Sequence, residues 1–79
     1  MEKLFTHFMQ VVLHGSISQA AIFLNITQPA ISRSIKTLEE RYKVQLFERK
    51  ARGVELTPAG QIMIERCILI ENEMKRYGI

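Results

Sequence analysis

The side chains best suited to binding chemistry in this sequence are basic ones gathered in its middle. Seven basic and three acidic residues lie between Arg33 and Arg52, whereas the rest of the chain has four basic and five acidic residues. Guanidinium and ammonium groups bind phosphate, and arginine can also donate two hydrogen bonds to a guanine edge. A run of charges can equally be an ordinary solvated surface. Which of the two applies depends on whether the elements that carry these residues place them on one face.

No arrangement typical of catalysis or metal binding accompanies the basic residues. Cys67 is the only cysteine, which excludes an internal disulfide and a cysteine-based zinc cluster. His7 and His14 have no cysteine or carboxylate at ligand spacing, and we expect both at the surface or boundary of a helix. No Ser-His-Asp set, paired carboxylates or phosphate-binding glycine loop is present. The sequence predicts no enzyme, no cofactor and no metal.

Composition is that of one small folded domain. The 79 residues are 47% hydrophobic, and the net charge of +3 with a pI near 9.4 mildly favours a polyanion partner. No apolar run approaches the roughly 18 residues of a membrane span. His7 and Gln10 interrupt the N-terminal apolar stretch, which argues against a signal peptide. We therefore expect no membrane partner and a cytoplasmic location.

Apolar periodicity and caps predict three consecutive helices. Residues 3–14 have helical spacing and end at Gly15, a favourable C-terminal residue. Ser16 and Gln19 form a capping box for a short second helix, and residues 25–27 form a break. Thr27 caps a third helix that runs to about Tyr42. Its apolar stripe and its polar face follow from the sequence: Ile31, Ile35, Leu38 and Tyr42 on one side, and Pro29, Arg33, Lys36 and Glu40 on the other, with Ser32 at the flank.

The spacing of the second and third helices is that of a helix-turn-helix. Small Ala21, turn residue Asn25 and branched Ile31 follow one another at the expected separations. Two short strands, Val44 to Glu48 and Val54 to Leu56, are then predicted to flank a turn at 49–53 that carries three positive charges at its tip. Such a hairpin would lie beside the third helix as a wing.

These elements favour DNA over the alternative partners. A recognition helix reads bases with its N-terminal residues, so Arg33 can pair with guanine and Gln28 with adenine, while Ser32 can reach a phosphate or a base. A basic wing can enter the minor groove. A winged-helix module for protein interaction would leave this face apolar or acidic, and an enzyme is the weakest alternative.

A fourth helix is predicted from Thr57-Pro58 to about Tyr77. A heptad-like seam runs along it, and its wide apolar arc exceeds what one small domain can cover. We expect it to pair with a second chain, the alternative being a core helix in a monomer. Cys67 is expected to be a small buried residue of the stripe rather than a redox sensor. The predicted dimerisation residues are Met63, Cys67, Ile70, Met74 and Tyr77.

The sequence resembles the N-terminal domain of the LysR-type transcriptional regulators over residues 3 to about 75. The matching segments are Gly15-Ser16-Ile17-Ser18-Gln19-Ala20-Ala21, Leu24, Thr27-Gln28-Pro29-Ala30-Ile31-Ser32-Arg33, Ile35, Leu38-Glu39-Glu40, Leu46-Phe47-Glu48-Arg49 and Leu56-Thr57-Pro58-Ala59-Gly60. The resemblance implies a mostly α fold, a winged helix-turn-helix of three helices and a two-stranded β wing over residues 1–57, followed by a long linker and dimerisation helix over 58–79.

The resemblance also implies a function. Relatives bind an imperfect inverted repeat in a promoter as dimers, with the recognition helix (about 28–42) in the major groove and the wing (49–53) at the minor groove. They respond to a small-molecule effector through a C-terminal domain to which nothing in these 79 residues corresponds. Relatives usually have glycine where Lys43 stands, so Lys43 either adopts a left-handed conformation or ends the helix differently. The predicted DNA-binding residues are Ser18, Thr27, Gln28, Pro29, Ser32, Arg33, Lys36, Arg49, Lys50 and Arg52.

Overall fold

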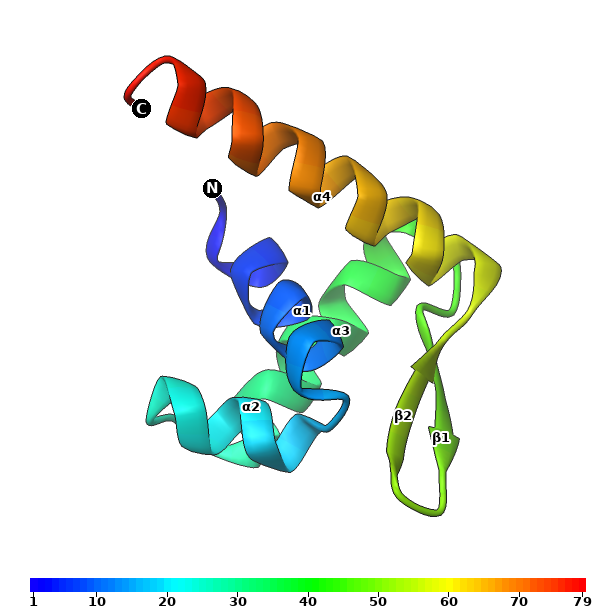
Figure 1. The fold of residues 1–79 in the computed structure, drawn as a ribbon. Coiled ribbons are helices and arrows are strands. Elements are labelled where there is room, and N and C mark those ends of the chain that lie inside the picture. Colours follow the sequence, from blue (N-terminus) through cyan, green and yellow to red (C-terminus); the bar gives the residue numbers. More distant parts are fainter.

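Four helices and a two-stranded antiparallel sheet make up the computed structural model, which describes residues 1–79 (Figure 1). The three N-terminal helices lie against one another, the sheet projects beside them, and the last helix crosses above them. This arrangement confirms the predicted winged helix-turn-helix with a long final helix. The elements are α1 (Lys3–His14), α2 (Ile17–Leu24), α3 (Gln28–Tyr42), β1 (Phe47–Lys50), β2 (Gly53–Leu56) and α4 (Pro58–Arg76).

The helix ends follow the predicted capping residues. Gly15 ends α1 with φ 67°, and Asn25 ends α2 with φ 56°, both in the left-handed region that allows a sharp turn. Oγ of Ser16 accepts a hydrogen bond from N of Gln19 at the start of α2. The exposed Gln19 side chain makes no return bond, so the predicted capping box is only half formed. Oγ1 of Thr27 accepts from N of Ala30 and caps α3 as expected.

The sequence left open whether Lys43 adopts a left-handed conformation or ends the helix differently, and the structure shows the first. It ends α3 with φ 56° and ψ 42°, so it takes the left-handed conformation in which glycine is usual. A side chain in that region costs about 1 kcal/mol. The chain therefore turns toward the wing in the way a glycine would turn it.

One apolar core joins all four helices and the first strand. Phe8 and Val11 of α1 and Ile31 and Leu38 of α3 are fully buried, and Tyr42 at the end of the predicted stripe is half exposed. The core continues into α4 through two of its residues. The buried apolar side chains are Phe8, Val11, Ile17, Ala20, Ala21, Ile31, Ile35, Leu38, Leu46, Phe47, Ile64 and Cys67.

His7 departs from the expectation of a surface or boundary position. It is only 7% exposed, because Oγ of Ser34 on α3 supplies a hydrogen-bond partner 2.7 Å from Nδ1 of the imidazole. Burial, with a smaller contribution from the charge of Lys3, lowers the pKa of His7. The imidazole is thus a polar member of the α1–α3 contact.

The hairpin is shorter and shifted relative to the prediction. Phe47 pairs with Leu56 and Lys50 with Gly53, so a two-residue turn, Ala51–Arg52, joins the strands. Residues 44–46 lie outside β1, and N of Leu46 donates to Oε2 of Glu39 at 2.8 Å rather than across the hairpin. Arg49 and Lys50 consequently belong to β1, so the predicted turn boundary of 49–53 was wrong and only Arg52 of the three basic residues lies in the turn.

One backbone hydrogen bond closes the open end of the hairpin, from N of Thr57 to the carbonyl of Leu46 at 3.0 Å. Another attaches the hairpin to the helices, from N of Val54 to the carbonyl of Gly15 at 3.1 Å. Gly53 has φ 97°, and a Cβ there would collide with the carbonyl oxygen of Gly15. The missing side chain therefore lets the hairpin lie against the turn between α1 and α2. No helix of the structure is both long and apolar enough for a membrane span.

Candidate nucleic-acid interface

The outer face of α3 carries the polar residues that the sequence predicted there. Gln28, Pro29, Arg33 and Lys36 are exposed and Ser32 is half-buried, on the side opposite the buried Ile31, Ile35 and Leu38. Thr27 is also exposed, but its hydroxyl is engaged in capping α3. Arg33 and Lys36 are in no ion pair within the chain. Both cations are therefore available to an external anion.

A hollow of about 260 Å³ lies where α2, α3 and the hairpin meet. Oγ of Ser16 and Oγ of Ser18, 2.9 Å apart at the start of α2, form one side of it. Hydroxyls and free backbone N–H groups at a helix start suit an anion such as phosphate. The residues that line this hollow are Ser16, Ile17, Ser18, Gln28, Arg49, Lys50, Gly53 and Val54.

A second hollow of about 380 Å³ lies between α3 and β1. Lys36 and Arg49 line it from opposite elements, and Ser32 and Gln45 add polar groups. Glu39 also lines it, but its carboxylate accepts a hydrogen bond from the backbone at Leu46. Arg49 lines both hollows, so its guanidinium has access to anions beside α2 and beside α3.

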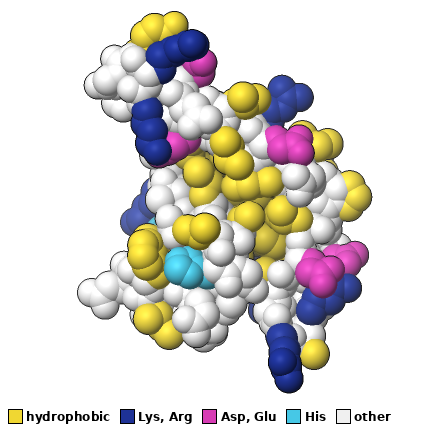
Figure 2. All heavy atoms as spheres, viewed as in Figure 1, with side chains coloured by type: hydrophobic (Ala, Val, Ile, Leu, Met, Phe, Trp, Pro, Cys, Tyr) yellow, Lys and Arg dark blue, Asp and Glu magenta, His cyan; other side chains and the backbone are white.

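The remaining basic residues of the hairpin are exposed at its outer end. Arg52 lies in the turn, and Lys50 is the last residue of β1. Nζ of Lys50 lies 3.5 Å from Oε2 of Glu48, an exposed ion pair of little strength. Basic side chains project from this end of the molecule (Figure 2).

The structure brings six of the ten predicted residues to the two hollows. They are Ser18, Gln28, Ser32, Lys36, Arg49 and Lys50. Pro29 and Arg33 lie on α3 outside them, Thr27 is a cap, and Arg52 lies beyond them in the turn. Sequence reasoning did not place Ser16 and Gln45 in the site. The N-cap role of Ser16 was a usable signal for the first, but no pattern marks Gln45, which follows a helix end and precedes a strand.

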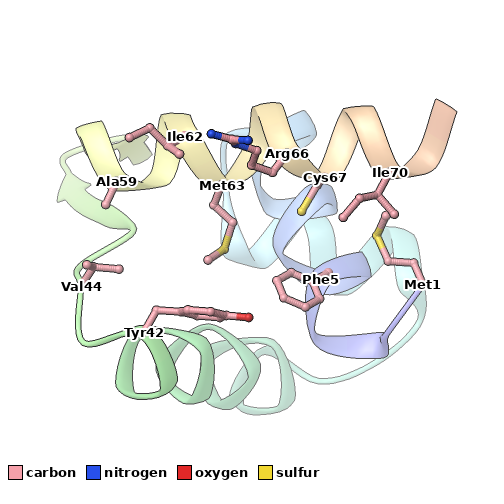
Figure 3. Close-up of a pocket in the computed structure, with 10 residues that line it drawn as sticks. All are labelled: Met1, Phe5, Tyr42, Val44, Ala59, Ile62, Met63, Arg66, Cys67 and Ile70. Atoms are coloured by element: carbon pink, nitrogen blue, oxygen red, sulfur yellow. The ribbon is translucent and has the colours of Figure 1, made fainter. Parts of the chain in front are cut away.

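Three of the five residues of the predicted α4 seam line a separate, apolar groove of about 390 Å³, and Met74 and Tyr77 lie beyond it (Figure 3). Met63, Cys67 and Ile70 extend from α4 toward Phe5 of α1 and Tyr42 of α3. Cys67 is only 3% exposed and belongs to the core, whereas Ile70 and Tyr77 are 52% and 69% exposed. Burial also raises the pKa of the Cys67 thiol, which suits an apolar role.

The first half of α4 thus packs on its own chain, and the second half is free. The buried residues of α4 are Gly60, Ile64 and Cys67, and none follows Cys67. Exposed apolar side chains continue along the helix at Ile68 and Leu69. The groove and the exposed apolar side chains of the outer half of α4 form one continuous apolar surface, and we call it the α4 groove.

The chain is similar to bacterial regulators with solved structures. It superimposes on CbnR_DBD from a DNA complex with a TM-score of 0.88 and 37% identity, covering 99% of this chain and 91% of that one. It superimposes on BenM_DBD from a complex with catB site 1 DNA with the same TM-score and 36% identity, covering 98% and 88%. Both likenesses extend over the whole fold, including the hairpin and α4.

The sequence comparisons agree with the structural ones. The HTH-type transcriptional regulator TdcA of Escherichia coli K12 is 47% identical over 68 residues, which are 86% of this chain and 22% of TdcA. This chain therefore spans about a fifth of the length of that relative. The model of the bacterial regulatory helix-turn-helix protein, lysR family, matches residues 3–61. With that match over three helices, the hairpin and the start of α4, the chain belongs to the lysR family of bacterial helix-turn-helix regulators.

Proposed function

We propose that this chain is a sequence-specific DNA-binding domain of a bacterial transcription regulator. The observation that carries the proposal is the convergence of hydroxyl, amide and basic side chains from α2, α3 and β1 around two adjoining hollows. The solved relatives CbnR_DBD and BenM_DBD, each similar over nearly the whole chain, were determined as DNA complexes. Membership of a family of regulators favours binding rather than catalysis. Binding to the chromosome would place the protein in the bacterial cytoplasm.

The residues divide into those that read bases and those that hold phosphates. With α3 in the major groove, Gln28 and Arg33 reach base edges from the first two turns of the helix. Pro29 makes van der Waals contact with the bases. Ser18, Ser32 and Lys36 hold the backbone, helped by the N-terminus of α3 that Thr27 caps. Arg49, Lys50 and Arg52 follow the DNA toward the minor groove, where the potential is most negative.

A second copy of the chain is the partner that we propose for the α4 groove. Its lining is apolar apart from Arg66, and the outer half of α4 has no cover of its own. A two-fold dimer would present two copies of α3 to two half-sites of an inverted repeat. Residues 1–57 would then bind DNA, and 58–79 would link and dimerise the domains. Any response to a small-molecule effector would belong to a further part of a regulator of the length of TdcA.

Selection from a random pool of duplexes tests the proposal directly. The 79-residue chain should enrich one sequence, and a pair of inverted half-sites if it binds as a dimer. A variant with both Arg33 and Arg49 replaced by alanine is the matched control and should enrich none, because it lacks cations on both sides of the site. Enrichment of no sequence by the wild type, or the same enrichment by the control, would contradict the proposal.

A further inference from the structure

The contact between α1 and α3 contains one polar pair among apolar side chains. Nδ1 of His7 lies 2.7 Å from Oγ of Ser34, and both residues are 7% exposed. Ser34 lies on the same side of α3 as the buried Ile31 and Leu38. A buried hydroxyl and a buried imidazole each cost free energy without a hydrogen bond, and here each is the partner of the other.

Apolar contacts and hydrogen bonds constrain a helix differently. Burial is not directional, so the apolar stripe holds α3 against α1 but fixes its rotation about the helix axis less narrowly than a hydrogen bond does. A hydrogen bond depends on distance and angle and does not tolerate it. The other polar link between these segments is the exposed pair of Arg41 and Glu2, 3.2 Å apart at the far end of α3. Between α1 and the middle of α3, the His7–Ser34 bond is therefore the directional contact, and the Glu39–Leu46 bond lies one turn further toward the end of the helix.

A rotation that breaks this bond also moves the neighbouring residue, Arg33. Side chains lie about 5–6 Å from a helix axis, so a rotation of about 20° shifts them by about 2 Å. That shift exceeds the tolerance of a hydrogen bond to a base edge. Attraction between a cation and a phosphate acts over about 8–10 Å and changes little over the same displacement.

We infer that His7 and Ser34 are a positioning pair that sets the rotation of α3 and thereby the choice of base sequence. The inference rests on the proposed DNA-binding function. Neither residue lies on the outer face of α3, so both act through Arg33 and its exposed neighbours. Loss of the pair would lower the preference for one sequence while leaving general attraction to DNA in place.

The test measures binding of the chain to two duplexes of equal length, the selected sequence and a scrambled one. His7→Phe and Ser34→Ala should each lower the ratio of the two affinities about tenfold, as the loss of one base contact would. Affinity for the scrambled duplex should change by less than about twofold. The double variant should be no worse than either single one, because the pair acts as a unit. His7→Asn should restore the ratio, because an amide can take the place of Nδ1.

Val11→Ala is the matched control for a loss of stability alone. Val11 is fully buried on α1, and its truncation removes packing but no hydrogen bond. At a temperature where all variants are folded by circular dichroism, this control should keep the wild-type ratio. An unchanged ratio in His7→Phe and Ser34→Ala, or an equal loss of both affinities, would overturn the inference. A wild type that prefers neither duplex would instead overturn the proposed function.

Discussion

Individual side chains of α3 differ in the contacts they can make with DNA. Arg33 has a planar guanidinium with two parallel donors, is exposed, and has no partner within the chain. Lys36 lies one turn further and presents a single charged group. The first geometry discriminates between bases, and the second attracts any phosphate.

Arg33→Ala is expected to weaken binding to the selected duplex by about 1–3 kcal/mol, because a bidentate base contact is lost. Binding to a scrambled duplex should weaken far less. A filter or fluorescence titration at constant salt measures both. Arg76→Ala, which removes the same side chain from the far end of α4, should change neither. An equal loss for the two duplexes would contradict the role of Arg33 in reading bases.

His7 links stability to pH. Its pKa is lowered in the folded chain, so the unfolded state binds more protons below its ordinary pKa of 6.5. The free energy of unfolding should therefore be constant above about pH 7 and fall as pH drops below 6.5. Urea unfolding between pH 7.5 and about 5.5 measures this change. His7→Asn lacks the titrating group and should give a flatter profile, and equal slopes for both proteins would contradict the assignment.

At this scale the sequence predicted exposure better than burial. The exposed positions of Arg33 and Lys36 follow from helical periodicity, because the apolar stripe fixes the opposite face. His7 has the same periodicity as its apolar neighbours but is a polar type, and a partner 27 residues away decides whether it can be buried. No local pattern contains that information.

At the scale of elements, the position of the hairpin depends on two glycines in contact. Gly15 ends α1 and accepts the hydrogen bond from Val54, while Gly53 leaves room for that carbonyl. The two positions exclude a side chain for different reasons. A Cβ at Gly15 meets nothing within 4 Å and has only the left-handed φ against it, whereas a Cβ at Gly53 meets backbone.

Gly53→Ala should therefore disturb the hairpin more than Gly15→Ala does. Gly15→Ala is expected to cost about 1 kcal/mol of stability, the price of the left-handed backbone alone. Gly53→Ala adds a backbone clash and the loss of a hydrogen bond, about 2–4 kcal/mol in all. Chemical denaturation measures both. The variant at Gly53 should also lose DNA affinity at temperatures where it is folded, and equal effects of the two substitutions would contradict this account.

Substitution of Arg52 tests whether the hairpin contributes to DNA binding through its positive charge. Its position in the turn, outside both hollows, suits contact with the backbone rather than with a base. Arg52→Ala should weaken binding to selected and scrambled duplexes alike and reduce the slope of log affinity against log salt by about 1. Titrations at several salt concentrations measure the slope. A selective loss for one sequence would show instead that Arg52 reads a base.

The helices could be predicted almost to the residue, and the strands could not. Gly15, Asn25, Thr27 and Pro58 mark helix ends by their own chemistry, which acts locally. The start of β1 depends on Glu39, whose carboxylate takes the backbone N–H of Leu46 out of the sheet. The register also depends on the contact of Gly53 with Gly15. Both are tertiary contacts, so the alternation of side chains in residues 44–56 could not fix the strand boundaries.

At the scale of the whole molecule, the proposed dimer joins two surfaces. The α4 groove would hold a second chain, and the outer face of α3 in each chain would contact one half-site. Ile70 lines the groove and is 52% exposed, so a second chain would bury it. Cys67 supports the groove from the core. The sequence predicted the seam of α4 but not which of its residues face their own domain, because a heptad pattern does not distinguish an internal partner from an external one.

Ile70→Glu should separate dimerisation from DNA contact. A second chain would have to take the carboxylate out of water, even beside Arg66, and this desolvation weakens association by at least about tenfold, while glutamate keeps the propensity of α4 to be helical. Sedimentation at micromolar concentration should show the variant shifted to monomer. Its affinity for a duplex with one half-site should match that of the wild type, and its gain from a second half-site should disappear, because linked sites increase the local concentration. Leu13→Glu changes an apolar residue on α1 that is 73% exposed and outside the groove, and it should leave the dimer intact. If Ile70→Glu leaves the sedimentation of the chain unchanged, or if Leu13→Glu disrupts the dimer equally, the second copy binds elsewhere and the spacing of the half-sites is set by a different surface.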